Sequence, residues 1–111
     1  IRDRYYSLAR GLPNKKKIIS RKRGYHGVTL AAASLTGMPY AQDGFSLPLD
    51  FVLHAQAPDY FNEALPNENE ETFSDRLAKE LEILILEEDP ETIAAFFSEP
   101  VMGSGCVIIP P

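Results

Sequence analysis

One stretch of the sequence constrains the fold more than any other, because a helical pattern in it leads directly into an apolar run. Apolar side chains recur at helical spacing at Phe73, Leu77, Leu81 and Leu84. Thr72 and Asp75 form a capping-box-like pair at the start of this pattern, and Pro90 ends it. Residues 92–97 then form a continuous apolar run of strand length. A helix that leads into an apolar strand predicts a parallel, buried sheet.

The first third of the chain predicts the same kind of layer. A helix is expected up to about residue 10, and residues 17–21 predict a short strand. Gly24 and Gly27 follow this strand, and the small side chains of residues 29–35 then favour a closely packed helix or turn. The order is strand, glycine-rich loop and helix.

The rest of the chain continues the alternation. Residues 37–50 contain two glycines and two prolines and predict an irregular surface loop, whereas residues 51–54 predict another short strand. Strands that alternate with helices predict an α/β fold with a mostly parallel sheet and flanking helices. Ligands of such folds gather at the carboxyl ends of the strands. Two loops qualify, residues 24–27 after the first strand and residues 99–100 after the last.

The first loop reads Gly-Tyr-His-Gly. Tyr25 can stack its ring on a planar heterocycle, and the flanking glycines let the backbone approach a ligand closely. The alternative is a core aromatic beside a tight turn. His26 is a candidate general base, although a lone histidine more often forms structural hydrogen bonds.

The second loop begins with a carboxylate. Glu99 directly follows the apolar run, so its charge needs a hydrogen-bond donor, a cation or a proton. The alternative is a strand-end carboxylate that faces water. Cys106 has no histidine near it in sequence, and we interpret it as a small packing residue rather than a nucleophile.

Length and composition limit the organisation of the chain. It has 111 residues, of which 44% are hydrophobic, enough for one modest core but not for two ordinary domains. We expect residues 1–111 to form one domain or part of one, with no second domain. The chain has no initiating methionine and ends on the apolar residues 108–111, which favours a fragment.

Charge, cysteine and hydropathy argue against several classes of function. The formal net charge is −5, but a basic run, residues 15–23, is a possible contact with nucleic acid. Ile18 and Ile19 interrupt it and no aromatic stacking platform accompanies it, so we expect no nucleic-acid partner. The acids near the long helix, such as Glu68 and Glu88, are expected to be solvated.

No apolar run approaches the ~20 residues of a membrane-spanning helix, and the N-terminal residues lack a signal-peptide core. We therefore expect a soluble, cytoplasmic protein without a membrane partner. The chain has one cysteine and no cysteine or histidine cluster with metal-ligand spacing, so no disulfide and no metal site are expected.

Two runs of the sequence resemble the class III pyridoxal-phosphate-dependent aminotransferases, especially the omega-amino-acid:pyruvate type. The first run is KIISRKRGYHGVT at residues 17–29, continued by AASLTG at residues 32–37. The second is AAFFSEPVMGSG at residues 94–105, with residues 107–111 after it. The two runs stand in the expected order, which makes the resemblance specific.

The resemblance implies a piece of a fold-type-I large domain, the cofactor pyridoxal 5'-phosphate, and a homodimer or tetramer with active sites at the subunit interface. It implies that Tyr25 stacks on the pyridine ring and that Glu99 belongs to the hydrogen-bonded network beside the cofactor. With His26 these residues are the predicted cofactor-binding residues.

Three parts of the family's catalytic machinery have no counterpart in this sequence. They are the Schiff-base lysine, the aspartate that pairs with the pyridine nitrogen, and the phosphate-binding loop. We therefore predict no catalytic residue within the chain, and we expect the fragment alone to be inactive. Cys106 also stands where relatives often have glycine.

The implied function of the full-length protein is transfer of an amino group from an amine or omega-amino acid to pyruvate or a similar keto acid. Relatives that act on ornithine or gamma-aminobutyrate tend to carry a second glutamate five positions after the first, where this chain has Ser104. That difference favours the pyruvate-type branch. Two alternatives are another fold-type-I activity (racemase, aminomutase or decarboxylase) and a non-catalytic module of a larger assembly.

Overall fold

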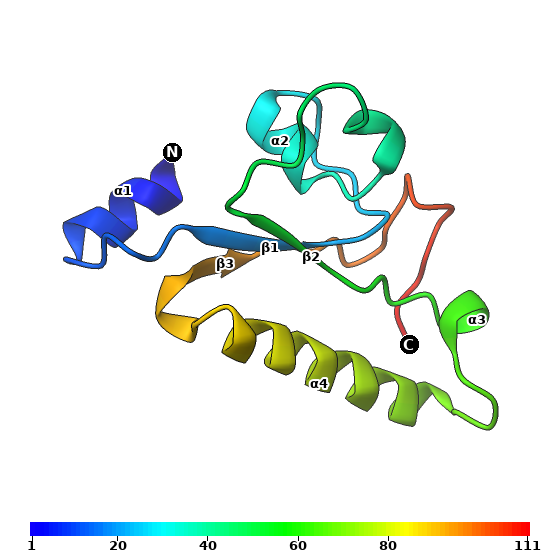
Figure 1. Cartoon of the computed structure of the whole chain (residues 1–111). Coiled ribbons are helices and arrows are strands. Elements are labelled where there is room, and N and C mark those ends of the chain that lie inside the picture. The colour runs from blue at the N-terminus through cyan, green and yellow to red at the C-terminus, as the bar shows by residue number, and fades with distance from the viewer.

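The computed structural model describes all residues 1–111 and contains a three-stranded parallel sheet between helices (Figure 1). The central strand is β1 (Lys17–Arg21), flanked by β2 (Val52–Ala55) and β3 (Ile93–Phe96). Both neighbours run parallel to β1, with Ile18 opposite Val52 on one side. The predicted α/β fold and parallel sheet are confirmed, and each strand lies within one residue of its predicted bounds.

The two helices that connect the strands lie on opposite faces of the sheet. Helix α2 (Leu30–Leu35) follows β1, and helix α4 (Glu70–Glu87) follows β2 and returns the chain across β1 to β3. Figure 1 shows α2 on one side of the sheet and α4 on the other. Crossovers of the same hand that step in opposite directions along a sheet place their helices in this way. The carboxyl ends of all three strands therefore meet at one edge.

The start of α4 differs from the prediction. Its N-cap is Asn69, whose Oδ1 accepts from the Thr72 amide at 2.8 Å, while the Thr72 hydroxyl accepts from the Asn69 amide at 3.0 Å. The capping box is thus Asn69 with Thr72, and the prediction of Thr72 with Asp75 was wrong by one turn. An asparagine N-cap is as favourable as a serine one, and Glu70 and Glu71 add negative charge to the first turn.

Side chains tie α4 to its surroundings, and two acids predicted to be solvated form ion pairs. Glu68 accepts two hydrogen bonds from Arg76, at 2.8 and 3.0 Å, and its side chain is only 9% exposed. Glu88 pairs with Lys17 of β1 at 2.7 Å, which joins the end of α4 to the start of the central strand. The contact of Glu88 joins residues 71 positions apart, so it depends on the tertiary fold rather than on the local sequence.

The shorter elements are α1 (Arg2–Ala9), the 3₁₀ turns η1 (Pro39–Ala41) and η2 (Pro90–Thr92), and α3 (Tyr60–Glu63). The helix predicted up to residue 10 is confirmed as α1. Helix α3 was not predicted, and Asp59 caps its first turn through the Asn62 amide. The ring of Tyr60 then meets the ring of Phe73 edge-on at 5.5 Å.

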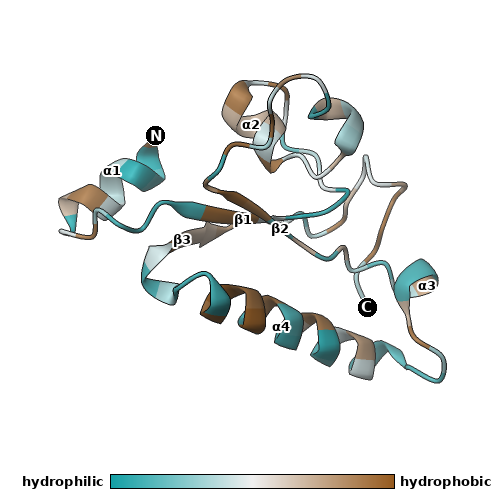
Figure 2. Ribbon diagram, in the orientation of Figure 1, coloured by the Kyte–Doolittle hydropathy of each residue, from teal (hydrophilic) through white to brown (hydrophobic).

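The core lies where the sheet meets both helical layers. Ile19 and Phe73 are completely buried, and Val52 and Ala33 nearly so. Figure 2 shows hydrophobic and hydrophilic residues alternating along α4, as expected for a helix with one face on a sheet. The prediction of a buried strand at β3 was only partly right, since Phe96 is 39% exposed. In this chain β3 is an edge strand with a neighbour on one side only.

Candidate functional site

The loops that follow β1 and β3 lie side by side at the carboxyl edge of the sheet. The backbone N–H of Tyr25 donates to Oε1 of Glu99 at 2.8 Å. This contact is possible because β1 and β3 are adjacent and parallel, so that both chains leave the sheet at the same edge. The structure therefore brings together the two loops that the sequence singled out.

The loop after β1 is held along its backbone by the segment that follows α2. The Thr36 hydroxyl accepts from the His26 amide at 3.0 Å and lies 3.0 Å from the carbonyl oxygen of Gly27. Thr36 is completely buried, and the Gly37 amide donates to the Gly24 carbonyl at 2.9 Å. Sequence reasoning missed Thr36. The available signal was a hydroxyl residue at the end of an apolar helix and directly before a glycine.

Close approach of the backbone requires glycine at position 37 and favours it at position 24. A Cβ atom on Gly37 would lie 2.6 Å from Cα of Lys22, which no real side chain tolerates. A Cβ atom on Gly24 would lie 3.0 Å from the Arg21 carbonyl oxygen, 3.3 Å from His26 Nε2 and 3.5 Å from Glu99 Oε1. Gly24 thus keeps open a narrow space between the histidine and the glutamate.

The two ring side chains of the loop have different environments. Tyr25 is 42% exposed, so part of its ring is free to contact a ligand. The ring of His26 meets Phe97 edge-on, with 6.2 Å between ring centroids, and its Nε2 atom is buried without a hydrogen-bond partner. Tyr25 is therefore placed as a contact surface, whereas His26 faces the interior of the site.

A third loop is joined to the same edge by an ion pair. Arg23, just after β1, pairs with Asp59, and its Nη2 donates to the Gly105 carbonyl at 2.7 Å. The Asn62 side chain and then Arg23 hold the pKa of the Asp59 carboxyl below its usual value. The segment after β3 is thereby fastened to the segment after β2.

Cys106 lies in the segment after β3, next to Gly105, and the prediction of a packing residue was wrong. The side chain is exposed, and the backbone has φ of +74°, a left-handed conformation that glycine adopts most easily. Its thiol lies beside the Arg23 guanidinium. Cysteine therefore occupies a position whose backbone suits glycine.

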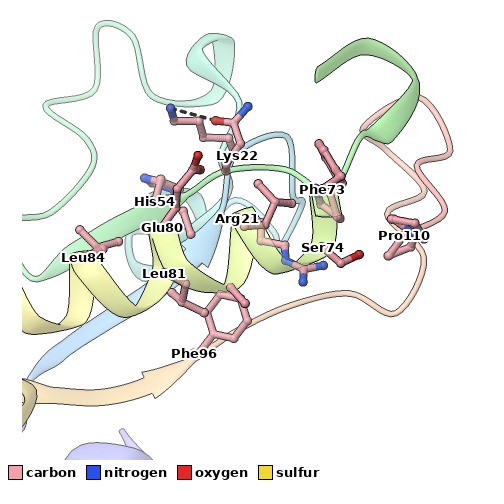
Figure 3. A pocket seen from close by; sticks show the side chains of 16 residues that line it. Arg21, Lys22, His54, Phe73, Ser74, Glu80, Leu81, Leu84, Phe96 and Pro110 are labelled. Atoms are coloured by element: carbon pink, nitrogen blue, oxygen red, sulfur yellow. Dashed lines mark hydrogen bonds between the residues drawn. The ribbon is translucent and has the colours of Figure 1, made fainter. Parts of the chain in front are cut away.

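A separate cavity of about 460 Å³ lies between α4 and the sheet. Figure 3 shows Arg21, Leu81 and Phe96 among the side chains that line it. The Arg21 guanidinium lies 5.6 Å from the centre of the Phe96 ring, and burial lowers its pKa. Neither Tyr25 nor Glu99 lines this cavity, so the candidate site is the strand-end edge and not this space.

His54 of β2, which also lines this cavity, is not placed as an acid or base of the strand-end site. It is half-buried, its Nε2 lies 3.3 Å from the Leu35 carbonyl oxygen, and burial lowers its pKa. The structure contains no group of three or more His, Cys, Asp or Glu side chains that could hold a metal ion. None of its helices combines the length and the apolar character needed to cross a membrane.

Comparison with known proteins decides the family. The model of the family described as "Aminotransferase class-III" matches residues 3–111. The chain belongs to the class III aminotransferases. The tomato (Solanum lycopersicum) protein "Gamma aminobutyrate transaminase 1, mitochondrial" is 61% identical over 107 residues, which are 96% of this chain and 21% of that protein. The "Probable gamma-aminobutyrate transaminase 3, mitochondrial" of Oryza sativa subsp. indica is 58% identical over the same shares.

Solved structures of transaminases match the fold closely. The omega transaminase from Pseudomonas jessenii in complex with PMP has a TM-score of 0.97 and 58% sequence identity, covering 98% of this chain and 24% of that one. The predicted assignment to part of a fold-type-I aminotransferase is thus confirmed. The chain spans about a fifth of the length of the curated relatives it matches.

The same relatives overturn the prediction of a cytoplasmic protein, because both transaminases above are named mitochondrial. That prediction depended on the absence of a targeting segment in the chain. A chain that spans a fifth of its relatives carries no information on such a segment.

Class III aminotransferases depend on pyridoxal phosphate, and the residues at the strand-end edge fit such a group. Tyr25 presents a partly exposed aromatic face, and Gly24 leaves a space that a Cβ would fill. A buried ring nitrogen, Nε2 of His26, and the Glu99 carboxylate border that space. This donor and acceptor set at the end of a parallel sheet suits a planar, polar heterocycle.

Proposed function

We propose that the full-length protein is a pyridoxal-phosphate-dependent transaminase that moves the amino group of an amine or omega-amino acid to pyruvate or a similar keto acid. Residues 1–111 are part of its cofactor-binding large domain. The observation that carries this proposal is the hydrogen bond that joins Tyr25 to Glu99 within a chain that matches the family over residues 3–111.

Gamma-aminobutyrate is the first amine donor to consider, because the curated relatives at 56 to 61% identity are named for it. Ser104 is a single position that favours the pyruvate-type branch, and we keep from it pyruvate as the acceptor. An omega-amino acid donor and pyruvate as acceptor satisfy both observations. The related structure named an omega transaminase supports the same substrate class.

The residues of this chain hold the cofactor ring rather than carry out its chemistry. Pyridoxal phosphate, when bound, supplies the electron sink for amino-group transfer. We propose that Tyr25 packs its ring against the pyridine ring, with the loop backbone fixed by Thr36 and Glu99. Glu99 and His26 provide polar groups beside it.

We also propose that the full-length protein is a homodimer. Several large apolar side chains before, on and after α2 are exposed in this chain, namely Val28, Leu30, Tyr40 and Phe45. A surface of this kind needs a protein partner, either other parts of the protein or a second copy. Sedimentation of the full-length protein tests the proposal: a monomer contradicts it, and a tetramer would extend it.

The activity is tested with purified full-length protein, pyridoxal phosphate, gamma-aminobutyrate and pyruvate. We expect a visible absorbance band from the bound cofactor and formation of alanine that requires both substrates. Replacing pyruvate with 2-oxoglutarate identifies the acceptor. With L-alanine as the only substrate, racemisation of the alanine or release of carbon dioxide would indicate another fold-type-I activity. Absence of the absorbance band would contradict the proposal as a whole.

A further inference from the structure

His26 carries the one buried side-chain nitrogen of the chain that has no hydrogen-bond partner. Burial of a polar atom without a partner costs free energy, and native proteins keep such atoms mainly where they have a task. The His26 amide is already engaged by Thr36, so the loop conformation does not explain the orientation of the ring. The inward orientation of the imidazole ring therefore needs another explanation.

Glu99 supplies that explanation, because it borders the same small space. The position of the absent Gly24 Cβ is 3.3 Å from His26 Nε2 and 3.5 Å from Glu99 Oε1. The Phe97 ring packs edge-on against the imidazole at 6.2 Å and offers it no acceptor. The Arg21 carbonyl oxygen also borders this space, 3.0 Å from the same position, but it already accepts from the Gly24 amide at 3.1 Å. The Glu99 carboxylate is therefore the side-chain acceptor beside Nε2.

We infer that His26 is a positioning residue for Glu99 and, through Glu99, for Tyr25. An N–H on Nε2 would point across the space left by Gly24 toward the Glu99 carboxylate, which lies beyond direct hydrogen-bond distance. Such an N–H restrains the carboxylate on the Tyr25 amide, to which it is bonded at 2.8 Å. The side chain of Tyr25 is then fixed relative to the sheet without touching His26.

The interaction of His26 with Glu99 and its effect on cofactor binding can be tested separately. Only the consequence, tighter binding of the cofactor, rests on the proposed function. Three variants of the full-length protein test both. His26→Gln places an amide N–H near the position of Nε2, His26→Asn places one near the position of Nδ1, and His26→Phe keeps the ring and its contact with Phe97 but has no donor.

Thermal unfolding of the cofactor-free protein tests the contact. We expect His26→Phe and Glu99→Ala each to lower the melting temperature by about 2 °C, and the double variant to lower it no further than the larger single change. His26→Gln restores most of the loss, whereas His26→Asn does not. Additive losses, or equal values for the Gln and Asn variants, would overturn the inference.

Titration with pyridoxal phosphate, followed by absorbance, tests the consequence. We expect His26→Phe to weaken binding roughly tenfold and His26→Gln to remain within about threefold of wild type. If wild type does not bind pyridoxal phosphate, the proposed function fails while the unfolding experiment still decides on the contact. If wild type binds and His26→Phe binds equally well, the positioning role is wrong although the proposed function stands. If the His26→Phe protein does not fold, the comparison of His26→Gln with His26→Asn still tests the inference.

Discussion

The backbone amide of Tyr25 donates a hydrogen bond of 2.8 Å to Oε1 of Glu99, a residue 74 positions later in the chain. The two residues follow β1 and β3, which are adjacent in the sheet. The bond therefore makes one structural unit of two loops that the sequence separates widely. Substitutions at five positions test the parts of this edge of the sheet.

Replacing Glu99 with alanine removes the acceptor of the Tyr25 amide. A single such hydrogen bond contributes about 1 kcal/mol, and one to a charged acceptor somewhat more. We expect the Tyr25 amide of the full-length protein to exchange with solvent deuterium roughly tenfold faster in Glu99→Ala than in wild type. Glu99→Gln keeps an acceptor oxygen and serves as the matched control. An unchanged exchange rate in the alanine variant would show that the bond does not restrain the loop.

Replacing Thr36 with valine keeps its shape and removes its hydroxyl. The His26 amide and the Gly27 carbonyl then lose a buried partner, which costs about 1–3 kcal/mol. We expect a lower urea midpoint of unfolding for the full-length protein. Thr36→Ser keeps the hydroxyl and loses only a methyl group, so it should be the milder change. If Thr36→Ser lowered the urea midpoint as much as Thr36→Val, the role of Thr36 would be packing of its methyl group rather than hydrogen bonding.

The sequence predicted the strands well because their signals are local. Residues 17–21 and 92–97 are short apolar or mixed runs followed within three residues by glycine or proline. The helix between strands indicates a parallel sheet. The start of α4 was predicted three residues late. The helical spacing of the apolar residues indicates that a helix exists, but the side chain of Asn69 determines where it begins.

The contacts that build the site were not predictable in the same way. Thr36 reaches His26 across ten residues, and Arg23 reaches Asp59 across 36. Such pairs are set by how the loops fold back over the sheet edge, which no local pattern encodes. Tyr25 and Glu99 were found because the ends of parallel strands share an edge, a rule that depends on topology alone.

Replacing Asp59 with asparagine tests the electrostatics of the third loop. The folded-state pKa of Asp59 lies below its ordinary value of about 3.9, so the charged form stabilises the fold at neutral pH and this contribution is lost as the pH falls through the folded-state pKa. We expect wild type to melt higher than Asp59→Asn at pH 7, with the difference shrinking toward pH 3. The exposed acid Asp75, which makes no ion pair, provides the control Asp75→Asn. A difference that is constant with pH would contradict the role of the charge.

Replacing Cys106 with glycine should stabilise the protein. The residue has φ of +74°, where an L-residue is strained by about 1–2 kcal/mol, and glycine recovers part of this at an entropic cost of about 0.5–1 kcal/mol. We expect a small rise in the melting temperature of the full-length protein. Cys106→Ala removes the thiol without relieving the backbone and should give no rise. If Cys106→Ala and Cys106→Gly raised the melting temperature equally, the change would come from loss of the thiol and not from the backbone.

The central claim is that the loop after β1 forms a wall of the cofactor site through the ring of Tyr25. Its most direct test is the affinity of the full-length protein for pyridoxal phosphate in wild type, Tyr25→Phe and Tyr25→Ala, measured by absorbance titration. An aromatic stacking contact contributes about 0.5–1.5 kcal/mol beyond the area it buries, so the alanine variant should bind at least tenfold more weakly. Tyr25→Phe keeps the ring and should bind about as tightly as wild type. Equal affinity of wild type and the alanine variant would contradict the account.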